Sequence, residues 1–344
     1  MYKKKVAAIF YAILAAVFYA VNMPASKVLL KNVEPAMMAA LLYLGAGIGI
    51  GMLFLFYKDK NNAGENLTRE DLPYTISMIV LDIIAPVFLM FGLLYTTSAN
   101  ASLLNNFEIV ATSMIALVVF KEMISKRLWI AVFLVTLSSA ILSFEDMSSL
   151  KFSWGSLLVL LAACCWGLEN NCTRRISSRN VYEIVTLKGI FSGLGSFVIS
   201  QISGEHLPAF QYCIAALILG FFAYGLSIFF YIKAQNVLGA AKTSAYYAIA
   251  PFIGALLSFV FLKEALTVNY LAALVIMLLG SAIVVIDTMI LYHTHKHTHT
   301  ITHTHDGSTH THTIAHSHVH SHFGPNGQHR HAHGLEITTH HVHG

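Results

Sequence analysis

Charged residues, cysteines and prolines are all scarce in this 344-residue chain. Only 11% of the residues are Asp, Glu, Lys or Arg, against about 25% in ordinary soluble domains, which excludes a soluble fold for most of the chain. The four cysteines fall in apolar stretches and offer no disulfide framework. A phosphate-binding loop is absent, so the common P-loop nucleotide site is excluded. Outside the apolar stretches there is no basic helix or aromatic-basic module, so no nucleic-acid partner is expected.

Hydrophobic residues make up 56% of the chain and are concentrated before residue 292. A membrane helix needs about 20 apolar residues to cross about 30 Å of hydrocarbon. We therefore predict an all-α membrane protein with ten transmembrane helices. They cover residues 6–29, 36–57, 73–95, 99–120, 127–145, 153–173, 181–203, 208–234, 240–262 and 267–291. Lys3 to Lys5 before the first apolar run also resemble a secretory signal, but that run has a counterpart later in the chain.

The distribution of Lys and Arg predicts the orientation in the membrane, because these residues accumulate in cytoplasmic loops. With a cytoplasmic N-terminus, most of the basic residues of the apolar region fall on the inner side. The outer side receives only Lys27, Lys31, Lys151 and Lys263. Ten crossings return the chain to the side on which it began. The prediction is a multi-pass plasma-membrane protein, embedded in the lipid bilayer, with both termini in the cytoplasm.

The two halves of the apolar region repeat one another. Lys121-Glu122 ends the fourth predicted helix, and Lys263-Glu264 ends the ninth, 142 residues later. Because five helices are an odd number, the second copy must cross the membrane in the opposite direction, as in the inverted repeats of secondary transporters. The predicted organisation is a first five-helix repeat at residues 1–147, a second at 148–291, and a histidine-rich tail at 292–344.

Three stretches carry a resemblance to a known family. They are Leu94-Tyr95-Thr96-Thr97-Ser98-Ala99-Asn100-Ala101, Cys165-Trp166-Gly167-Leu168-Glu169-Asn170-Asn171-Cys172-Thr173-Arg174 and Ala250-Pro251-Phe252-Ile253-Gly254-Ala255. Their order and spacing make residues 6–288 resemble EamA-type members of the drug/metabolite transporter superfamily. The resemblance implies a secondary transporter, usually an exporter, with no ATP site and no enzyme activity. Ile109 departs from the pattern, since it stands where Pro251 stands in the second half, and the histidine-rich tail lies outside it.

Polar side chains inside the predicted helices are candidates for a solute site, because a charge at the centre of a bilayer costs about 2.5–3.5 kcal/mol on insertion scales. Helical spacing places Asn105, Glu108 and Thr112 on one face of the fourth predicted helix. The candidate cavity residues are Asn22, Asp82, Asn105, Glu108, Thr112 and Glu169. Their carboxylates would take up protons or attract a cation. Alternatively, Lys188 neutralises a carboxylate and the amides join helices.

Three further patterns each have two interpretations. Cys165, Glu169 and Cys172 recur at helical spacing and could hold a soft or borderline divalent ion, or could simply pack. The glycines of residues 45–51 and 189–193 allow close helix approach, either inside one bundle or in a homodimer. The last pattern is a set of tyrosines that could stack on an organic solute or fill the core: Tyr224, Tyr231, Tyr246 and Tyr247.

Eighteen of the nineteen histidines lie after residue 292, and most alternate with Thr, Ser or Ala. Alternate residues of an extended chain share a face, and neutral imidazole binds zinc, nickel, cobalt and copper alike. Asp306-Gly307 marks a candidate hairpin turn, although a hairpin without a core is marginal in water. We predict a tail that is largely disordered without metal and orders locally with it. Its candidate ligands are His293, His295, His297, His299, His303, His305, His310, His312, His316, His318, His320 and His322.

These observations together predict a secondary transporter that exports a small solute, with a divalent transition metal of the nickel, cobalt or zinc class as the first candidate. No cofactor is required for this activity; the metal at the tail is a separate ligand. One alternative is an exporter of an amino acid or another small metabolite whose tail senses or buffers metal. Another is a membrane-anchored metal store or sensor that moves no solute.

Overall fold

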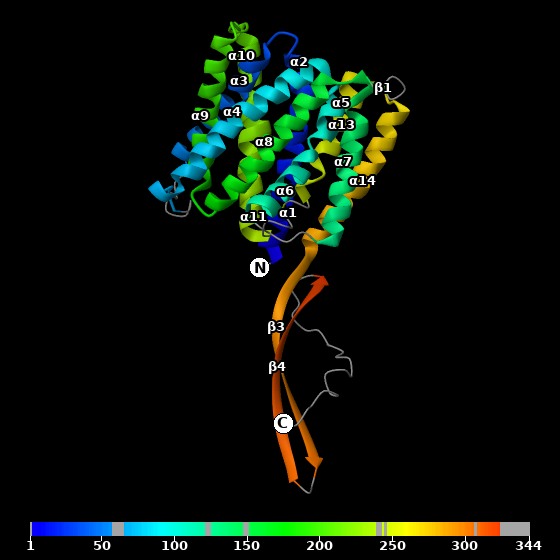
Figure 1. The fold of residues 1–344 in the computed structure, drawn as a ribbon. Helices are drawn as coiled ribbons and strands as arrows, with labels where there is room; N and C mark the ends of the chain where they lie inside the picture. The colour runs from blue at the N-terminus through cyan, green and yellow to red at the C-terminus, as the bar shows by residue number, and fades with distance from the viewer. Residues whose placement is uncertain are drawn as a thin grey trace. The chain divides into compact units, whose positions relative to one another are not determined.

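The computed structural model describes residues 2–56, 65–120, 125–146, 151–238, 243, 246–305 and 308–323. Figure 1 shows a bundle of apolar helices followed by a two-stranded hairpin. The first half of the bundle contains α1 (Tyr2–Ala20), α2 (Asn22–Leu29), α3 (Pro35–Phe56), η2 (Arg69–Asp71), α4 (Leu72–Tyr95), α5 (Ser98–Leu104), α6 (Phe107–Phe120) and α7 (Lys126–Leu142). The second half contains α8 (Trp154–Ile176), α9 (Val181–Ile202), α10 (Phe210–Gly220), η3 (Phe221–Leu226), α11 (Ser227–Leu238), α13 (Ala250–Leu262) and α14 (Val268–Met289).

The ten predicted crossings correspond to these elements, as far as the described residues extend. Seven of the crossings are helical segments both long and apolar enough to cross a membrane by length and composition. Three fall short of that measure within the described residues. α7 has 17 residues, α8 carries Glu169, Arg174 and Arg175, and α13 has 13 residues. The bundle also exposes many large apolar side chains, among them Phe133 (65%) and Leu256 (61%), which suits a surface facing lipid.

The pairing of helices reflects the internal repeat. α3 packs against its counterpart α9, and α5 of the fourth crossing packs against α13 of the ninth, the crossing that the repeat makes equivalent to the fourth. α7 meets α14, where the Ser138 hydroxyl donates to the Ala273 carbonyl at 2.7 Å. α4 packs against α8. Exchanging the two halves turns this contact into one between α11 and α1, and that contact is also present. Exchange of the two halves therefore maps this set of contacts onto itself.

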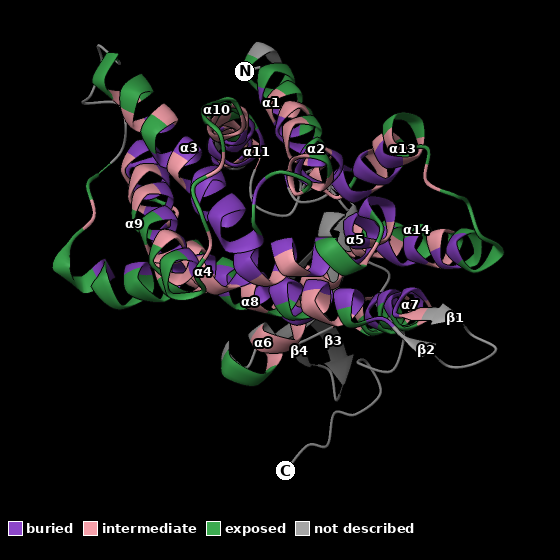
Figure 2. Ribbon diagram, turned by 90° about the horizontal axis from the view of Figure 1, so that it is seen from above, coloured by how far each residue is buried: buried purple, intermediate pink, exposed green. Residues whose placement is uncertain are grey.

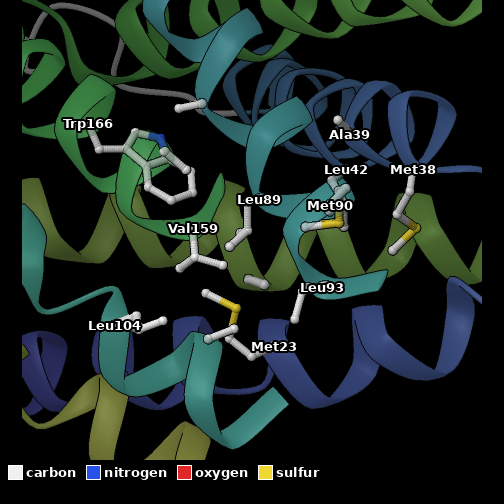
Figure 3. Packing of buried hydrophobic residues seen from close by; sticks show 14 of the residues in the cluster. Met23, Met38, Ala39, Leu42, Leu89, Met90, Leu93, Leu104, Val159 and Trp166 are labelled. Carbon is white, nitrogen blue, oxygen red and sulfur yellow. The ribbon is translucent and has the colours of Figure 1, made fainter. Parts of the chain in front are cut away.

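The core lies where the two halves meet. Figure 2 shows the buried parts of the helices facing the inside of the bundle. Figure 3 shows part of this core, in which Met38 and Leu42 of α3 and Leu89 of α4 lie among methionine and leucine side chains, with Val159 and Trp166 of α8. The unbranched, polarizable methionine side chain fills irregular gaps between helices.

The glycine pattern of α3 brings it into backbone contact with two helices of the other half. A Cβ atom at Gly47 would lie 2.5 Å from the amide nitrogen of Ile190 in α9. A Cβ atom at Gly45 would lie even closer to the Leu217 carbonyl oxygen in α10. The glycines are therefore used for packing within one bundle, the intramolecular alternative of the two predicted uses.

Four of the crossings are interrupted, which the sequence did not predict. α1 and α2 are separated at Val21, α5 and α6 at Asn105 and Asn106, and α10 and α11 by the π-helix η3. A turn at residues 248–249 precedes α13. The 142-residue offset of the repeat carries Asn106 onto residue 248, so the breaks before α6 and α13 are equivalent.

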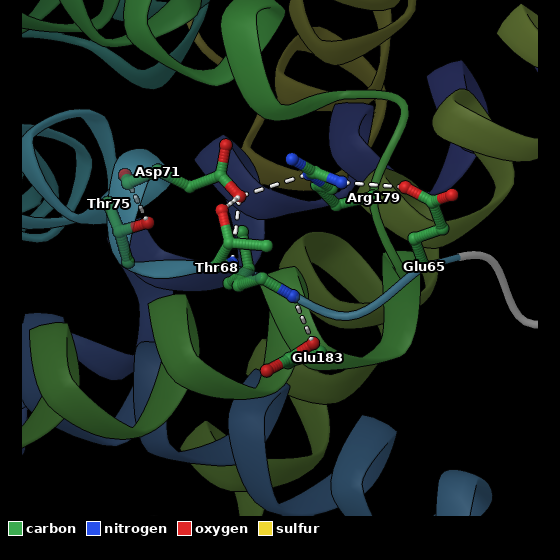
Figure 4. Close-up of polar contacts among 7 residues, drawn as sticks. Glu65, Thr68, Asp71, Thr75, Arg179 and Glu183 are labelled. Carbon is green, nitrogen blue, oxygen red and sulfur yellow. Dashed lines mark hydrogen bonds and ion pairs between the residues drawn. The ribbon is translucent and has the colours of Figure 1, made fainter.

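Hydrogen bonds and ion pairs between the two halves stabilise both ends of the bundle. At the end of the bundle where the N-terminus lies, the Glu183 carboxylate accepts from the Leu67 amide at 2.9 Å, and Arg179 pairs with Glu65 at 2.7 Å and with Asp71 at 3.0 Å (Figure 4). At the other end, the Glu205 carboxylate accepts from the amide of Met37 at 2.6 Å. The segments that form one of these contacts are the repeat counterparts of the segments that form the other.

A second carboxylate acts in the same way at the end of the bundle that contains Glu205. The two oxygens of Glu264 accept from the amides of Ser98 and Ala99, both at 2.8 Å, at the start of α5. Beside it, the Lys27 ammonium donates to the carbonyls of Leu93 and of Thr96, where α4 ends. The Lys-Glu sequence that marks the repeat therefore supplies, in the second half, a cap for a helix of the first.

Residues Thr288–Gly344 form a unit separate from the bundle. In it, β3 (Ile290–His305) pairs antiparallel with β4 (Ser308–Phe323), and His305 stands opposite Ser308. This confirms the predicted hairpin around Asp306-Gly307, two residues that themselves lie outside the described part. The strands extend well beyond the predicted segment of 301–314. The prediction that the tail is largely disordered without metal is a statement about the protein in solution, and it stays a prediction.

A short antiparallel pair of strands, β1 (Phe144–Asp146) and β2 (Lys151–Phe152), links α7 to α8 within the bundle.

Candidate functional site

A lysine and two carboxylates meet in the interior of the bundle, between the two halves. The Lys188 ammonium of α9 lies 2.9 Å from an oxygen of Asp82 in α4 and 2.9 Å from an oxygen of Glu169 in α8. Asp82 is fully buried, and Glu169 and Lys188 are exposed by only 2% and 7%. The Tyr43 hydroxyl of α3 donates to the other Asp82 oxygen at 2.9 Å. Asp82, Glu169 and Lys188 are called the charged triad below.

The charged triad has a formal charge of minus one when all three groups are ionised. Buried charges in a membrane protein are costly and mark solute or proton pathways. The contact of Lys188 with Asp82 is an ion pair without hydrogen-bond geometry, because the same Asp82 oxygen has no hydrogen-bond partner. Glu169 has a second donor in the Thr173 hydroxyl. The triad therefore joins α4 of the first half to α8 and α9 of the second.

Glu108 and Thr112 of α6 face α8. The Glu108 carboxylate accepts a hydrogen bond from the Asn170 side chain, and the Thr112 carbonyl accepts one from Asn171 at 3.3 Å. Asn170 is the neighbour of Glu169 in α8, so Glu108 lies on a helix that packs beside the charged triad.

Asn22 and Asn105 lie at two of the helix interruptions and bind tyrosines. The Asn22 amide donates to the Tyr224 hydroxyl at 3.0 Å, and the Asn105 amide donates to the Tyr19 hydroxyl at 3.0 Å. Both asparagines are buried. The Asn105 side-chain oxygen has no hydrogen-bond partner. The interrupted helices thus place amides in the interior, as the discontinuous helices of transporters do around their sites.

Four tyrosine rings connect these asparagines to the charged triad. The Tyr19 ring lies with its centroid 6.1 Å from that of Tyr224 and 5.8 Å from that of Tyr247. The Tyr224 ring lies 5.0 Å from that of Tyr43, whose hydroxyl binds Asp82. Tyr19 and Tyr43 were missed by sequence reasoning, and no spacing in the chain singles them out.

One prediction about the site is wrong. Asn105, Glu108 and Thr112 were expected on one face of a continuous helix, but α5 ends at Leu104 and α6 begins at Phe107. Asn105 binds Tyr19 of α1, whereas Glu108 and Thr112 face α8. Asparagine side chains compete with the backbone for hydrogen bonds and so favour helix ends over helix interiors, which accounts for a break at Asn105-Asn106.

Lys188 contacts Asp82 and Glu169. This arrangement agrees with the predicted alternative in which Lys188 neutralises a carboxylate. Because Glu169 is held by Lys188 and Thr173, it is not free to join Cys165 and Cys172 around a metal ion. Among the described residues of the bundle, no cluster of three or more His, Cys, Asp or Glu side chains could hold a metal.

In the tail, the strand register puts histidines of β3 opposite histidines of β4. The pairs are His293 with His320, His295 with His318, His297 with His316 and His303 with His310.

An inverted bundle of interrupted helices around buried charges defines a class of protein, the membrane transporters of small solutes. Comparison with known families narrows the class: the EamA-like transporter family matches residues 6–144 and 153–286. The chain therefore belongs to that family, and it is a multi-pass membrane protein.

Individual relatives carry the same description. A protein of Methanothermobacter thermautotrophicus, named an uncharacterized transporter, is 25% identical over 78% of this chain and 83% of its own length. An uncharacterized transporter of Clostridium kluyveri is 24% identical over 79% of this chain and 91% of its own. A solved crystal structure is similar in fold with a TM-score of 0.60 and 16% identity, covering 82% of this chain and 97% of the other.

Proposed function

We propose that the protein is a secondary transporter of the plasma membrane that exports a small, positively charged solute through the centre of the bundle, with both termini in the cytoplasm. The observation that carries the proposal is the excess of carboxylates at the junction of the halves. The buried Asp82 and Glu169 and the partly buried Glu108 are accompanied there by the ammonium of Lys188. An uncompensated buried negative charge attracts a cation, whether a proton or a solute.

A divalent transition-metal cation is the first specific cargo to test. The register of β3 and β4 supports it, because it sets four pairs of histidines at opposing positions of the hairpin. Imidazole pairs bind zinc, nickel, cobalt and copper. We propose that the tail collects such an ion at the cytoplasmic end of the transport path.

An organic cargo, such as an amino acid or a small amine, is the second candidate. It is favoured by the contact of Lys188 with Asp82 and Glu169, which occupies two of the carboxylates that a metal would need. It is also favoured by the tyrosines beside them. In this case the tail senses or buffers metal.

Uptake into inside-out membrane vesicles tests the proposal. The full-length protein is assayed with nickel, cobalt, zinc, a set of amino acids and simple amines. Export in the cell appears as uptake into these vesicles. Vesicles from cells that lack the protein provide the baseline. Accumulation of at least one positively charged solute by the wild-type protein alone is expected. Uptake of none of these solutes, or only of anions, would contradict it.

The same assay separates the alternatives. A chain ending at Tyr292 loses metal uptake if the tail feeds the transport path, but keeps the uptake of an organic solute. A membrane-anchored metal store would bind metal only when the tail is present and would accumulate no solute in either form.

A further inference from the structure

The helix interruptions hold a second group of polar atoms that the charged triad does not use. Asn105 is exposed by only 4%, and its side-chain oxygen has no partner. Its amide nitrogen is committed to the Tyr19 hydroxyl at 3.0 Å. Glu108, three residues further along and beyond the helix interruption, receives a hydrogen bond from Asn170. Burying an amide oxygen without a partner is unfavourable, so this oxygen is available to accept a hydrogen bond from a solute.

Aromatic rings enclose the same place. The Tyr19 and Tyr247 rings lie 5.8 Å apart, centroid to centroid. Glu108 is joined to the same group through Asn105, because its backbone amide donates to the Asn105 carbonyl at 3.1 Å, and the Asn105 side chain donates to the Tyr19 hydroxyl at 3.0 Å. Tyr19 precedes the break between α1 and α2, and Tyr247 precedes the turn before α13. The four residues thus come from three crossings, and each lies beside a helix interruption.

The chemistry of these groups selects a cation that donates hydrogen bonds. The lone pairs of Asn105 and Glu108 accept hydrogen bonds, and the faces of Tyr19 and Tyr247 attract positive charge. Lys188 cannot complete the group, because its ammonium is held between Asp82 and Glu169. A protonated amine supplies both the missing donor and the missing charge.

A bare transition-metal ion fits the same groups poorly. Such an ion needs about four lone-pair ligands at about 2.0–2.3 Å, and no cluster of three suitable side chains exists among the described residues of the bundle. Tyrosine faces contribute nothing to metal coordination, whereas they bind ammonium groups within about 6 Å of the ring centroid.

We propose that Tyr19, Asn105, Glu108 and Tyr247 form a subsite for the ammonium group of an organic amine. The subsite rests on the proposed function in one respect: the solute passes between the two halves at the interrupted helices. Under this assignment the amine is the cargo, and metal at the tail has a regulatory role.

Binding to the purified full-length protein in detergent tests the subsite directly. The probes are n-butylammonium, its neutral analogue n-butanol, its anionic analogue butyrate, and nickel chloride. Isothermal titration calorimetry gives the affinities, and size-exclusion chromatography verifies the fold of each variant. Only n-butylammonium is expected to bind in a manner that depends on Glu108. Glu108→Gln is expected to weaken it by about tenfold or more, the effect of losing about 1.4 kcal/mol.

Tyr247 supplies variants that keep the test decisive if Glu108→Gln fails to fold. Tyr247→Phe keeps the ring and should weaken n-butylammonium binding less than Tyr247→Leu, which removes the ring and should weaken binding several-fold. Glu70→Gln alters an exposed carboxylate of η2 and should leave binding unchanged. Equal binding of butanol and butylammonium, or equal affinity in Tyr247→Phe and Tyr247→Leu, would overturn the subsite.

Failure of the subsite and failure of the proposed function give different results. If butylammonium binds through Glu108 but no solute accumulates in vesicles, the subsite stands and the transport proposal fails. If a solute accumulates while butylammonium binding ignores Glu108 and Tyr247, transport stands and the subsite is wrong. Nickel binding to the bundle that depends on Glu108 would replace the amine with a metal ion.

Discussion

Lys188 is the residue on which the interior of the bundle depends most. It lies between Asp82 and Glu169, and those two carboxylates come from different halves of the chain. Removing one member of a buried ionic group leaves the other charges without compensation, which is more costly than replacing the whole group with neutral side chains. The charged triad should therefore behave as a unit rather than as three independent residues.

Lys188→Met should lower the free energy of unfolding by about 3–5 kcal/mol, because it leaves two buried carboxylates without a counter-charge. Denaturant-induced unfolding in detergent micelles, followed by near-ultraviolet circular dichroism, measures the change. The matched control is the triple variant Lys188→Met, Asp82→Asn, Glu169→Gln, which should recover most of the loss. A triple variant as unstable as the single one would show that the triad does not act through charge.

Glycine and carboxylate contacts decide how the helices pack. α3 meets α9 at Gly47 and Gly189, where the two backbones touch, while Gly51, one turn further along α3, has only a Thr186 side chain near it at 3.3 Å. A Cβ atom would therefore meet backbone at Gly47, but only a side chain, which must shift by a few tenths of an ångström, at Gly51.

Gly47→Ala should destabilise the bundle by about 1–3 kcal/mol, because overpacking forces two helix backbones apart. Gly51→Ala should be close to neutral, since the Thr186 side chain can move and alanine favours the helix. Thermal unfolding of both variants in the same detergent gives the comparison. Equal melting temperatures for the two would mean that α3 and α9 adjust freely.

Glu264→Gln should weaken the start of α5. Its carboxylate caps two amides at 2.8 Å, and a negative charge at a helix N-terminus contributes about 1–2 kcal/mol together with the cap. Hydrogen exchange of the Ser98 and Ala99 amides should become faster, and exchange in α9 should not change. Glu70→Gln, at an exposed carboxylate, is the control. Unchanged exchange at Ser98 would rule out the cap.

Sequence reasoning found the crossings and the repeat, because both depend on long apolar runs and on a Lys-Glu pair repeated after 142 residues. It found Asp82, Glu108 and Glu169 because charge is rare in such runs. It missed the interruption at Asn105-Asn106, since neighbouring apolar residues maintain a helical pattern on both sides. It considered Lys188 only in an alternative interpretation, because the packing of α9 against α4 and α8 becomes apparent only in the folded chain.

At the scale of the whole molecule, the bundle and the tail are separate units, Met1–Asp287 and Thr288–Gly344. The histidines are confined almost entirely to the second unit. Folding of the bundle should therefore be independent of metal, whereas metal binding should depend on the tail.

A chain ending at Tyr292 should keep the melting temperature of the bundle and lose most of the bound nickel or zinc. Equilibrium dialysis of both forms measures the metal. Lowering the pH to about 5 should release metal from the full-length protein, because protonated imidazole cannot ligate. Equal metal content in the two forms would place the metal in the bundle and contradict the assignment of the tail.

The backbone contact between α3 and α9 has a consequence for how the molecule could change shape. These two helices belong to opposite halves, yet no side chain separates them at Gly47 and Gly189, so neither can slide or tilt without the other. We expect them to serve as a fixed pivot. We expect the interrupted helices to move when the interior opens to one side of the membrane and then to the other. A few dihedral angles at their interruptions can change without disturbing the pivot.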